Sequence, residues 1–304
     1  MASVILITGA ATGIGNLAAR ELAAHGHTVY ASMRNTETTN AQHAKDLVEL
    51  GHRTGRNLHV VELDVQSEES AEAAVATVLA REGRLDAVVH NAGHLYVGYV
   101  EAFTPEDVRH LFDINAIGAH RVNRAVLPHM RSRGTGTLVY VGSTTSVLLP
   151  PFIGPYVASK AAFDALAQVT AYEVGQYGIE TSIVMPGPFT AGTQHFPNAT
   201  HASDEDRTRA YAALDPMVAR NEEATNGLFA PDVNADPKAV AEDIARIIDL
   251  PFGTRPLRSV VDFSDGGVGA VNEVMYRAQE QYVMRMGFED LLHLKTEKAE
   301  SGTQ

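Results

Sequence analysis

The stretch TGAATGIG, residues Thr8–Gly15, follows the apolar run Val4–Ile7 and precedes a segment whose apolar residues recur at helical spacing. A buried strand that passes through a glycine-rich turn into a helix is typical of nucleotide-binding units. Gly9 can take the positive φ of a tight turn, and Gly13 and Gly15 let the backbone approach a ligand and a strand. The N–H groups of the first helical turn then face an anion. The stretch therefore indicates a ligand that carries phosphate, provided that the rest of the chain agrees.

The rest of the chain alternates short β-branched runs with helical patterns. The predicted strands are Val4–Ile7, Thr28–Ala31, Leu58–Leu63, Ala87–His90, Thr137–Val141, Thr181–Val184 and Ser259–Phe263. The predicted helices are Asn16–Ala24, Ala41–Leu50, Glu68–Arg81, Pro105–Arg131 with an interruption near Asn115, Pro155–Tyr177 and Pro237–Leu250. Continuous apolar strands indicate a parallel sheet that is buried on both faces. The pattern predicts an α/β fold: a Rossmann-type doubly wound sheet of about seven strands with helices on both faces.

A single domain over residues 1–304 is expected, because no linker or change in composition separates a second one. Residues from about 187 to 236 depart from the alternation and are predicted to form a substrate lid without a strand. A C-terminal extension from about 265 to 304 contains apolar residues at helical spacing from Val268 to Met286. Its last residues, Thr296–Gln304, are polar and are expected to fray.

Composition excludes several classes of protein. The 304 residues carry a formal net charge of −13, which argues against a nucleic-acid groove and an anionic membrane surface. The chain has no cysteine and therefore no disulfide or thiolate metal site. It enters a strand within three residues, which leaves no room for a signal peptide, and no apolar run approaches the roughly 18 residues that span a bilayer. We expect a cytoplasmic protein with no nucleic-acid or membrane partner and no metal site.

The end of the second predicted strand bears on which dinucleotide would bind. An acidic residue near this point usually binds both hydroxyls of the adenosine ribose and repels a 2′-phosphate. Here Arg34 follows the strand and no acid does. A guanidinium group is planar and permanently charged, and it can donate two parallel hydrogen bonds to a phosphate. Arg34 therefore favours NADP, which carries the 2′-phosphate, over NAD. The alternative is a solvated arginine after a strand.

Three polar residues suggest a reaction centre. Tyr156 and Lys160 are four residues apart on a predicted helix, so they share one face. Ser143 follows the strand Thr137–Val141, at the carboxyl edge where α/β sheets bind ligands. The alternative is an aromatic ring packed under a lysine stem, because Tyr-x-x-x-Lys also arises by chance.

Together these motifs resemble the short-chain dehydrogenase/reductase family. In chain order, the matches are Thr8, Gly9, Gly13 and Gly15 to T-G-x-x-x-G-x-G, Asp64 and Val65, Asn91-Ala92-Gly93, Asn115, Ser143, Tyr156 and Lys160, and Pro186-Gly187. They extend over roughly residues 3–187, and their joint order is highly specific. The second strand and the long carboxyl end are similar to the hydroxysteroid dehydrogenase and carbonyl reductase branch.

The resemblance implies a catalytic tetrad of Asn115, Ser143, Tyr156 and Lys160. Tyr156 would be the general acid in reduction and the base in oxidation, and Ser143 would hold the substrate oxygen. The ammonium of Lys160 is expected to lower the pKa of Tyr156 and to bind the nicotinamide ribose. Asn115 would support a proton relay; the alternative is a polar residue satisfied within an interrupted helix.

The resemblance also implies a set of cofactor contacts. They are Gly9, Thr12, Gly13, Ile14, Gly15, Arg34, Asp64, Val65, Asn91, Ala92, Gly93, Tyr156, Lys160, Pro186, Gly187, Phe189 and Thr190. Thr190 lies one position earlier than the threonine usual in the family, and Thr193 is the second candidate for that contact.

Three loops are expected to face the substrate. They supply His94, Leu95 and Tyr96; Leu148, Leu149, Pro150, Pro151 and Phe152; and Phe189, His195, Phe196, Tyr211, Met217 and Phe229. Their apolar character favours a hydrophobic ketone, aldehyde or secondary alcohol, although about half could pack the lid onto the body. His195 is expected on the solvent side of the lid. The predicted function is an NADP(H)-dependent oxidoreductase that forms a homodimer or homotetramer; the alternative is a non-catalytic NADP-binding sensor.

Overall fold

A parallel seven-stranded sheet forms the centre of the computed structural model, which describes residues 2–295. Its strands are β1 (Val4–Ile7), β2 (Thr28–Met33), β3 (Leu58–Glu62), β4 (Ala87–His90), β6 (Gly136–Val141), β7 (Ile179–Pro186) and β9 (Arg258–Val261). Their order is β3-β2-β1-β4-β6-β7-β9, so the chain moves outward from β1 in one direction and later returns to build the other half. This confirms the doubly wound Rossmann-type sheet and its seven predicted strands.

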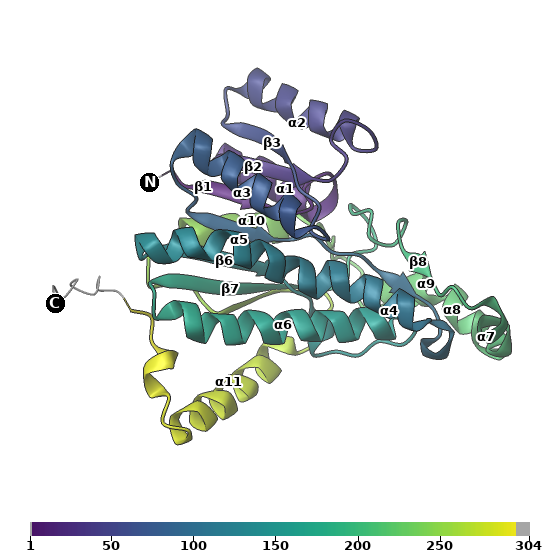
Figure 1. The fold of residues 1–304 in the computed structure, drawn as a ribbon. Coiled ribbons are helices and arrows are strands. Elements are labelled where there is room, and N and C mark those ends of the chain that lie inside the picture. Colours follow the sequence, from purple (N-terminus) through teal and green to yellow (C-terminus); the bar gives the residue numbers. More distant parts are fainter. Residues whose placement is uncertain (1, 296–304) are drawn as a thin grey trace.

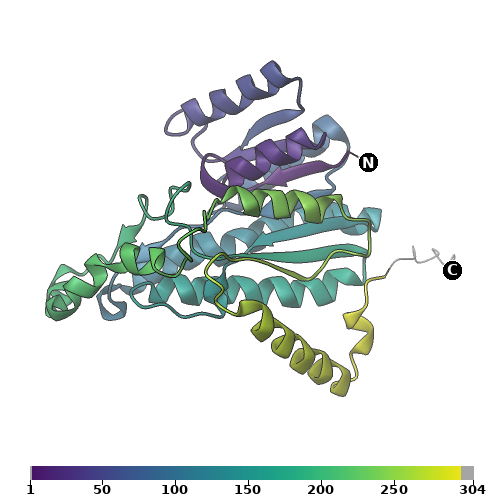
Figure 2. The ribbon, with the colours of Figure 1, turned by 180° about the vertical axis from the view of Figure 1, so that it is seen from behind.

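Helices cover both faces of the sheet (Figure 1). One face carries α3 (Glu68–Glu82), α5 (Gly118–Arg133) and α6 (Gly154–Gly175). The other face, seen from behind in Figure 2, carries α1 (Gly13–Ala24), α2 (Ala41–Thr54) and α10 (Lys238–Asp249). Side chains of successive strand residues enter opposite cores: Leu6 packs towards α3 and α5, and Ile5 and Ile7 pack towards α1 and α10. Burial on both faces explains the continuous apolar runs.

The helix predicted over Pro105–Arg131 is continuous but irregular. It consists of α4 (Pro105–Phe112), a π-helical turn at Asp113–Ile117, and α5. A capping box between Thr104 and Asp107 and a proline at its first turn start α4. The expected interruption near Asn115 is therefore a widened turn, of the kind often found at functional sites.

The lid segment is folded and contains a strand, so the prediction that it lacks one was wrong. β8 (Thr200–His201) pairs in parallel with β5 (Tyr96–Val97) in a separate two-stranded sheet. Two residues are too few to show a periodic pattern, and only the partner strand makes them extended. After β8 come α7 (Glu205–Ala210), α8 (Asp215–Ala219) and α9 (Asn221–Asn226), which project from the body at the right of Figure 1.

The C-terminal extension forms the predicted helix, α11 (Val268–Arg285), followed by a short 3₁₀ turn at Glu289–Leu292. α11 lies below α6 in Figure 1. The predicted frayed end, Thr296–Gln304, lies outside the described residues. Within residues 2–295, no helix is both long enough and apolar enough to cross a membrane.

Candidate active site

The glycine turn between β1 and α1 is shaped to hold an anion. Gly9 and Gly13 have φ of +66° and +56°, which only glycine adopts without strain. A Cβ on Gly9 would lie 2.8 Å from the Cα of Ala92. Thr12 caps α1 without a side-chain hydrogen bond, and the first turn contains no acidic residue. The first N–H groups of α1 therefore face the cavity without a side-chain acceptor, which fits the phosphates of a dinucleotide.

Asn91 braces this turn from the end of β4. Its Nδ2 donates to the carbonyl oxygens of Thr8 and Gly9, each at 3.0 Å. The backbone N–H groups of Asn91 and Ala92 both donate to the Thr8 hydroxyl at 3.0 Å. A Cβ on Gly15 would lie 2.4 Å from the same Asn91 amide, so Gly15 serves this packing. Asn91 thus fixes the turn relative to the sheet.

A cavity of about 710 Å³ runs from this turn along the carboxyl edge of the sheet. The expected site residues on its wall are Gly9, Thr12, Gly13, Ile14, Arg34, Asp64, Val65, Asn91, Ala92, Gly93, Ser143, Tyr156, Lys160, Pro186, Gly187 and Phe189. Three other expected residues, Gly15, Asn115 and Thr190, are not part of that wall. The Thr190 hydroxyl instead donates to Asn226 Oδ1 at 2.6 Å, whereas Thr193 lines the cavity.

Arg34 follows the last residue of β2, Met33, on the cavity wall. Its side chain is exposed and lines the cavity, and no carboxylate pairs with it among residues 2–295. The nearby acid is Glu62, but its carboxylate accepts the backbone N–H groups of Asn35 at 2.6 Å and Thr36 at 2.8 Å. Glu62 therefore holds the loop after β2 instead of offering a carboxylate to a ribose.

Ser143, Tyr156 and Lys160 meet at the other end of the cavity, and each is at most 7% exposed. β6 leads to Ser143, and the first turns of α6 carry Tyr156 and Lys160. The Lys160 ammonium donates to the Val141 carbonyl at 3.0 Å. The Ser143 hydroxyl accepts the backbone N–H of Thr145 at 3.1 Å and its hydroxyl at 2.9 Å. A reactive phenol, a hydroxyl and an ammonium thus converge in one buried corner.

Burial dominates the protonation of this corner. It raises the pKa of Tyr156 to about 12, although hydrogen bonds with Ser143 and Thr145 oppose the increase. It lowers the pKa of Lys160 to about 8. Lys160 is not among the groups that oppose the increase at Tyr156, and its ammonium binds a backbone carbonyl. The expectation that Lys160, together with an oxidised nicotinamide ring, lowers the pKa of Tyr156 stays a prediction. With its raised pKa, Tyr156 is a neutral phenol near pH 7.

Asn115 supports the site from behind the cavity. The π turn places its Oδ1 2.7 Å from the His94 N–H, while its Nδ2 donates to the His94 carbonyl and to Ser159 Oγ, both at 2.9 Å. Ser159 in turn donates to the Tyr156 carbonyl at 2.8 Å. A Cβ on Gly93 would lie 3.5 Å from Asn115 Oδ1 and 3.7 Å from Lys160 Nζ, so these groups are neighbours.

Not every residue expected to face the substrate does so. Those that line the cavity are His94, Leu95, Leu148, Leu149, Pro150, Pro151, Phe189, His195 and Phe196. Those that do not are Tyr96, Phe152, Tyr211, Met217 and Phe229. Tyr211, for example, stacks on Tyr99 at 4.8 Å between ring centroids. The solvent-side placement of His195 was wrong: its ring lies against that of Tyr156, with 5.4 Å between centroids.

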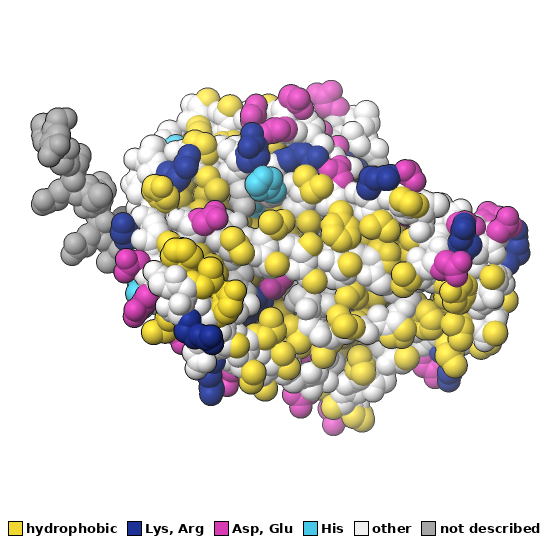
Figure 3. Space-filling view, turned by 60° about the horizontal axis from the view of Figure 1, so that its bottom comes forward, with side chains coloured by type: hydrophobic (Ala, Val, Ile, Leu, Met, Phe, Trp, Pro, Cys, Tyr) yellow, Lys and Arg dark blue, Asp and Glu magenta, His cyan; other side chains and the backbone are white. Residues whose placement is uncertain are grey.

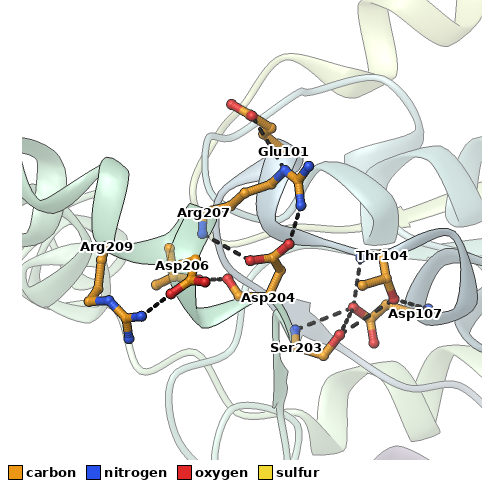
Figure 4. Close-up of polar contacts among 9 residues, drawn as sticks. Glu101, Thr104, Asp107, Ser203, Asp204, Asp206, Arg207 and Arg209 are labelled. Carbon is orange, nitrogen blue, oxygen red and sulfur yellow. Dashed lines mark hydrogen bonds and ion pairs between the residues drawn. The ribbon is translucent and has the colours of Figure 1, made fainter.

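Polar contacts attach the lid to the start of α4 (Figure 4). The Asp107 carboxylate accepts the Ser203 hydroxyl at 2.7 Å and the Ser203 N–H at 3.3 Å, and it also completes the capping box of α4. Beside it, Arg207 pairs with Asp204 and Glu101. Burial alone would raise the pKa of Asp107, but the hydrogen bonds from Ser203 and Thr104 outweigh it and lower that pKa.

Sequence reasoning missed several residues in or behind the cavity wall. Thr145, beside Ser143, and Ser159, between Asn115 and Tyr156, belong to no motif used above. Asn221 and Leu228 reach the cavity from the far end of the lid. Only the fold of the lid brings these last two to the site, so no local signal could have identified them.

The fold and the cavity define a nucleotide-binding α/β protein of the Rossmann class. A family model described as short chain dehydrogenase matches residues 3–202. The chain therefore belongs to this family, as expected, and is an NAD(P)-binding oxidoreductase that acts on CH–OH groups.

Individual relatives agree with this membership. The chain is 29% identical to 3-ketodihydrosphingosine reductase of Bacteroides thetaiotaomicron, over 83% of this chain and 87% of that protein. It is 34% identical to human 17-beta-hydroxysteroid dehydrogenase type 1, over 61% of this chain and 56% of that protein, which agrees with the expected branch.

Solved structures show the same fold. A short-chain dehydrogenase from Streptomyces avermitilis superposes with a TM-score of 0.71 and 28% identity, over 94% of this chain and 98% of that one. A gluconate 5-dehydrogenase from Burkholderia cenocepacia, in complex with NADP and tartrate, gives a TM-score of 0.69 and 25% identity, over 88% of this chain and 95% of that one.

Proposed function

We propose that the protein transfers a hydride between NADP(H) and a hydrophobic ketone or aldehyde, or the corresponding alcohol. The observation that carries this proposal is the buried corner of Ser143, Tyr156 and Lys160 at one end of a cavity whose other end holds the glycine turn. The wall beyond this corner is largely apolar and includes Leu149 and Phe196. The relatives named 3-ketodihydrosphingosine reductase and 17-beta-hydroxysteroid dehydrogenase type 1 support a hydrophobic substrate class.

Tyr156 is the general acid in this proposal. The phenol is protonated near neutral pH, so it can donate its proton to a carbonyl oxygen in the direction of reduction. Ser143 holds the same oxygen through its hydroxyl. Lys160, with a pKa of about 8, holds the ribose and exchanges protons readily, while Asn115 supports that relay. When bound, the nicotinamide ring supplies or accepts the hydride.

The proposal of NADP over NAD rests on Arg34 and Glu62. The guanidinium group of Arg34 has no carboxylate partner among the described residues, and the Glu62 carboxylate already accepts hydrogen bonds from N–H groups of the loop. An added 2′-phosphate would therefore find a cation in Arg34, while the carboxylate of Glu62 is already bound to the loop.

We also propose a homodimer or homotetramer that has neither nucleic-acid nor membrane partners and acts in the cytoplasm. Leu166 and Val169 of α6 are about half exposed, and hydrophobic side chains are spread over the lower face of the molecule (Figure 3). Burial of such a face in an assembly would support this proposal. The mass in solution, measured by light scattering, tests it.

Replacement of Tyr156 tests the catalytic proposal. Tyr156→Phe should reduce hydride transfer by about 10²- to 10⁴-fold, since general acid catalysis is lost, while NADPH binding stays close to that of the wild type. Single-turnover absorbance at the nicotinamide band and NADPH fluorescence measure the two effects. Tyr282→Phe, which alters an exposed tyrosine of α11, is the control. Wild-type turnover by Tyr156→Phe would contradict the proposal.

The sensor alternative predicts a different result. A non-catalytic NADP-binding protein would leave nicotinamide absorbance unchanged with every carbonyl compound and alcohol tested. A panel of steroids, quinones, aryl ketones and aliphatic aldehydes with NADPH and NADH decides between the two.

A further inference from the structure

His195 is a polar group of the cavity wall, and the mechanism above does not use it. It comes from the lid, lines the cavity wall, and lies against the Tyr156 ring at 5.4 Å between centroids and 64° between planes. Phe196 packs beside it at 6.4 Å. The lid therefore places an imidazole directly beside the reactive phenol.

The imidazole nitrogens form no hydrogen bond with other residues in the part of the chain that the structure describes; only the His195 backbone N–H does so, with Thr193 Oγ1. A polar side chain in an apolar wall has a cost unless a partner satisfies it. The ring faces a cavity that a substrate would enter. A substrate oxygen can therefore act as its hydrogen-bond partner.

We propose that His195 recognises a second oxygen of the substrate, attached to the first or second carbon from the reacting carbonyl. This inference rests on the proposed function and narrows its substrate class from hydrophobic ketones to hydrophobic hydroxyketones and diketones. The contact between the two rings points to this position, because an oxygen that the imidazole binds lies on the same part of the cavity wall as the phenol. We therefore place the second oxygen close to the reacting carbonyl.

The charge state of His195 also limits the class. Burial lowers its pKa to about 4, and the nearby Lys160 and His94 add to this effect. The ring is neutral at assay pH, so it offers one N–H donor and one nitrogen acceptor. A hydroxyl or carbonyl oxygen matches a neutral ring, whereas a carboxylate would favour its protonated form. We therefore expect an uncharged second oxygen.

The test compares matched ketones that differ only by this oxygen. The pairs are propiophenone with 2-hydroxypropiophenone, and butyrophenone with 1-phenyl-1,3-butanedione. The quantity measured is the ratio of kcat/KM within each pair, with NADPH, for the wild type, His195→Phe and His195→Gln. Phe keeps an aromatic ring against Tyr156 but removes both nitrogens; Gln removes the ring but keeps a neutral donor and acceptor.

In at least one pair, His195→Phe should lower the preference for the oxygenated ketone by about tenfold, the usual effect of one lost hydrogen bond. His195→Gln should retain most of that preference. The change in ratio between variants removes the intrinsic difference in reactivity of the two ketones. His201→Phe, which alters an exposed lid histidine outside the cavity wall, should leave both ratios unchanged.

An unchanged ratio in His195→Phe for both pairs would overturn the inference, as would equal losses on both members of each pair. The inference would also be overturned if the wild type reduced none of these four ketones while it reduced other carbonyl compounds. Failure of the proposed function looks different: Tyr156→Phe would then turn over substrate as the wild type does, whatever the ratios.

Discussion

At the scale of single residues, Arg34 has the clearest measurable consequence. Its guanidinium lines the adenosine end of the cavity without a carboxylate partner in the described part of the chain. A free cation of this kind discriminates between two cofactors that differ by one phosphate, because only one of them carries the matching anion.

Arg34→Ala should weaken NADPH binding by about 10- to 100-fold and change NADH binding little, since a charge-assisted contact contributes about 1.5–3 kcal/mol. Fluorescence titration of both cofactors measures the two dissociation constants. Arg56→Ala removes the same charge from an exposed position beyond α2 that does not line the cavity, and should affect neither. Equal weakening of NADH and NADPH by Arg34→Ala would refute the assignment to NADP.

Motif residues could be predicted because their chemistry depends on near neighbours in the sequence. The roles of Gly9 and Gly13 depend only on the turn that contains them, and the spacing of Tyr156 and Lys160 depends only on one helix. The contact between His195 and the Tyr156 ring could not be predicted, because it forms only through the fold of the lid. The burial of Tyr156 and Lys160 was also missed, since the sequence shows that the lysine is near but not how completely both side chains are enclosed.

At the scale of elements, polar contacts with the start of α4 help to attach the lid. The contact between Ser203 and Asp107 adds to the two paired residues of β8 and to the apolar packing of Phe196, Ala199 and Ala202 (Figure 4). The Asp107 carboxylate is charged at any ordinary assay pH, because its pKa is lowered. Hydrogen bonds to a charged acceptor are stronger than those between neutral groups.

Ser203→Ala should loosen the lid without disturbing the capping box of α4. Loss of a hydrogen bond to a charged group, about 1.5–3 kcal/mol, should speed amide exchange in β8 and α7 by about tenfold or more, while the melting temperature changes little. Hydrogen exchange read by mass spectrometry measures this. Ser132→Ala, whose hydroxyl binds its own helix, is the control. Unchanged exchange in the lid would show that this contact does not hold it.

The strands of the large sheet were easier to predict than the lid for a related reason. β1 is apolar throughout and β4 is apolar except for His90, because both faces of the sheet are covered, and the bounds of both match the sequence pattern residue for residue. β5 and β8 pair over only two residues each. Strands this short contain no periodic pattern of apolar residues, so neither strand can be recognised in the sequence.

At the scale of the whole molecule, His90 links global stability to pH. It ends β4 inside the core, 2% exposed, stacked on Tyr140 at 4.6 Å between centroids. Neither ring nitrogen has a hydrogen-bond partner among the described residues. Burial lowers its pKa from 6.5 to about 4, although Asn123 opposes the change.

The sign of the pH dependence follows from this shift. Between about pH 6.5 and 4, the unfolded chain binds a proton at His90 and the folded protein does not, so stability falls as the pH falls through this window. Between pH 7.5 and 5.0 the loss from this residue is about 2 kcal/mol, at 1.36 kcal/mol for each pKa unit.

His90→Phe keeps an aromatic ring against Tyr140 and removes the titration, so its free energy of unfolding should depend less on pH by about 2 kcal/mol over that interval. Urea unfolding at pH 7.5 and 5.0, at one protein concentration, measures the difference. The same substitution at His52, an exposed residue of α2, should leave the pH dependence of the wild type intact. If His90→Phe loses as much stability as the wild type on acidification, then His90 is not neutral in the folded core, and the acid sensitivity of the molecule originates elsewhere.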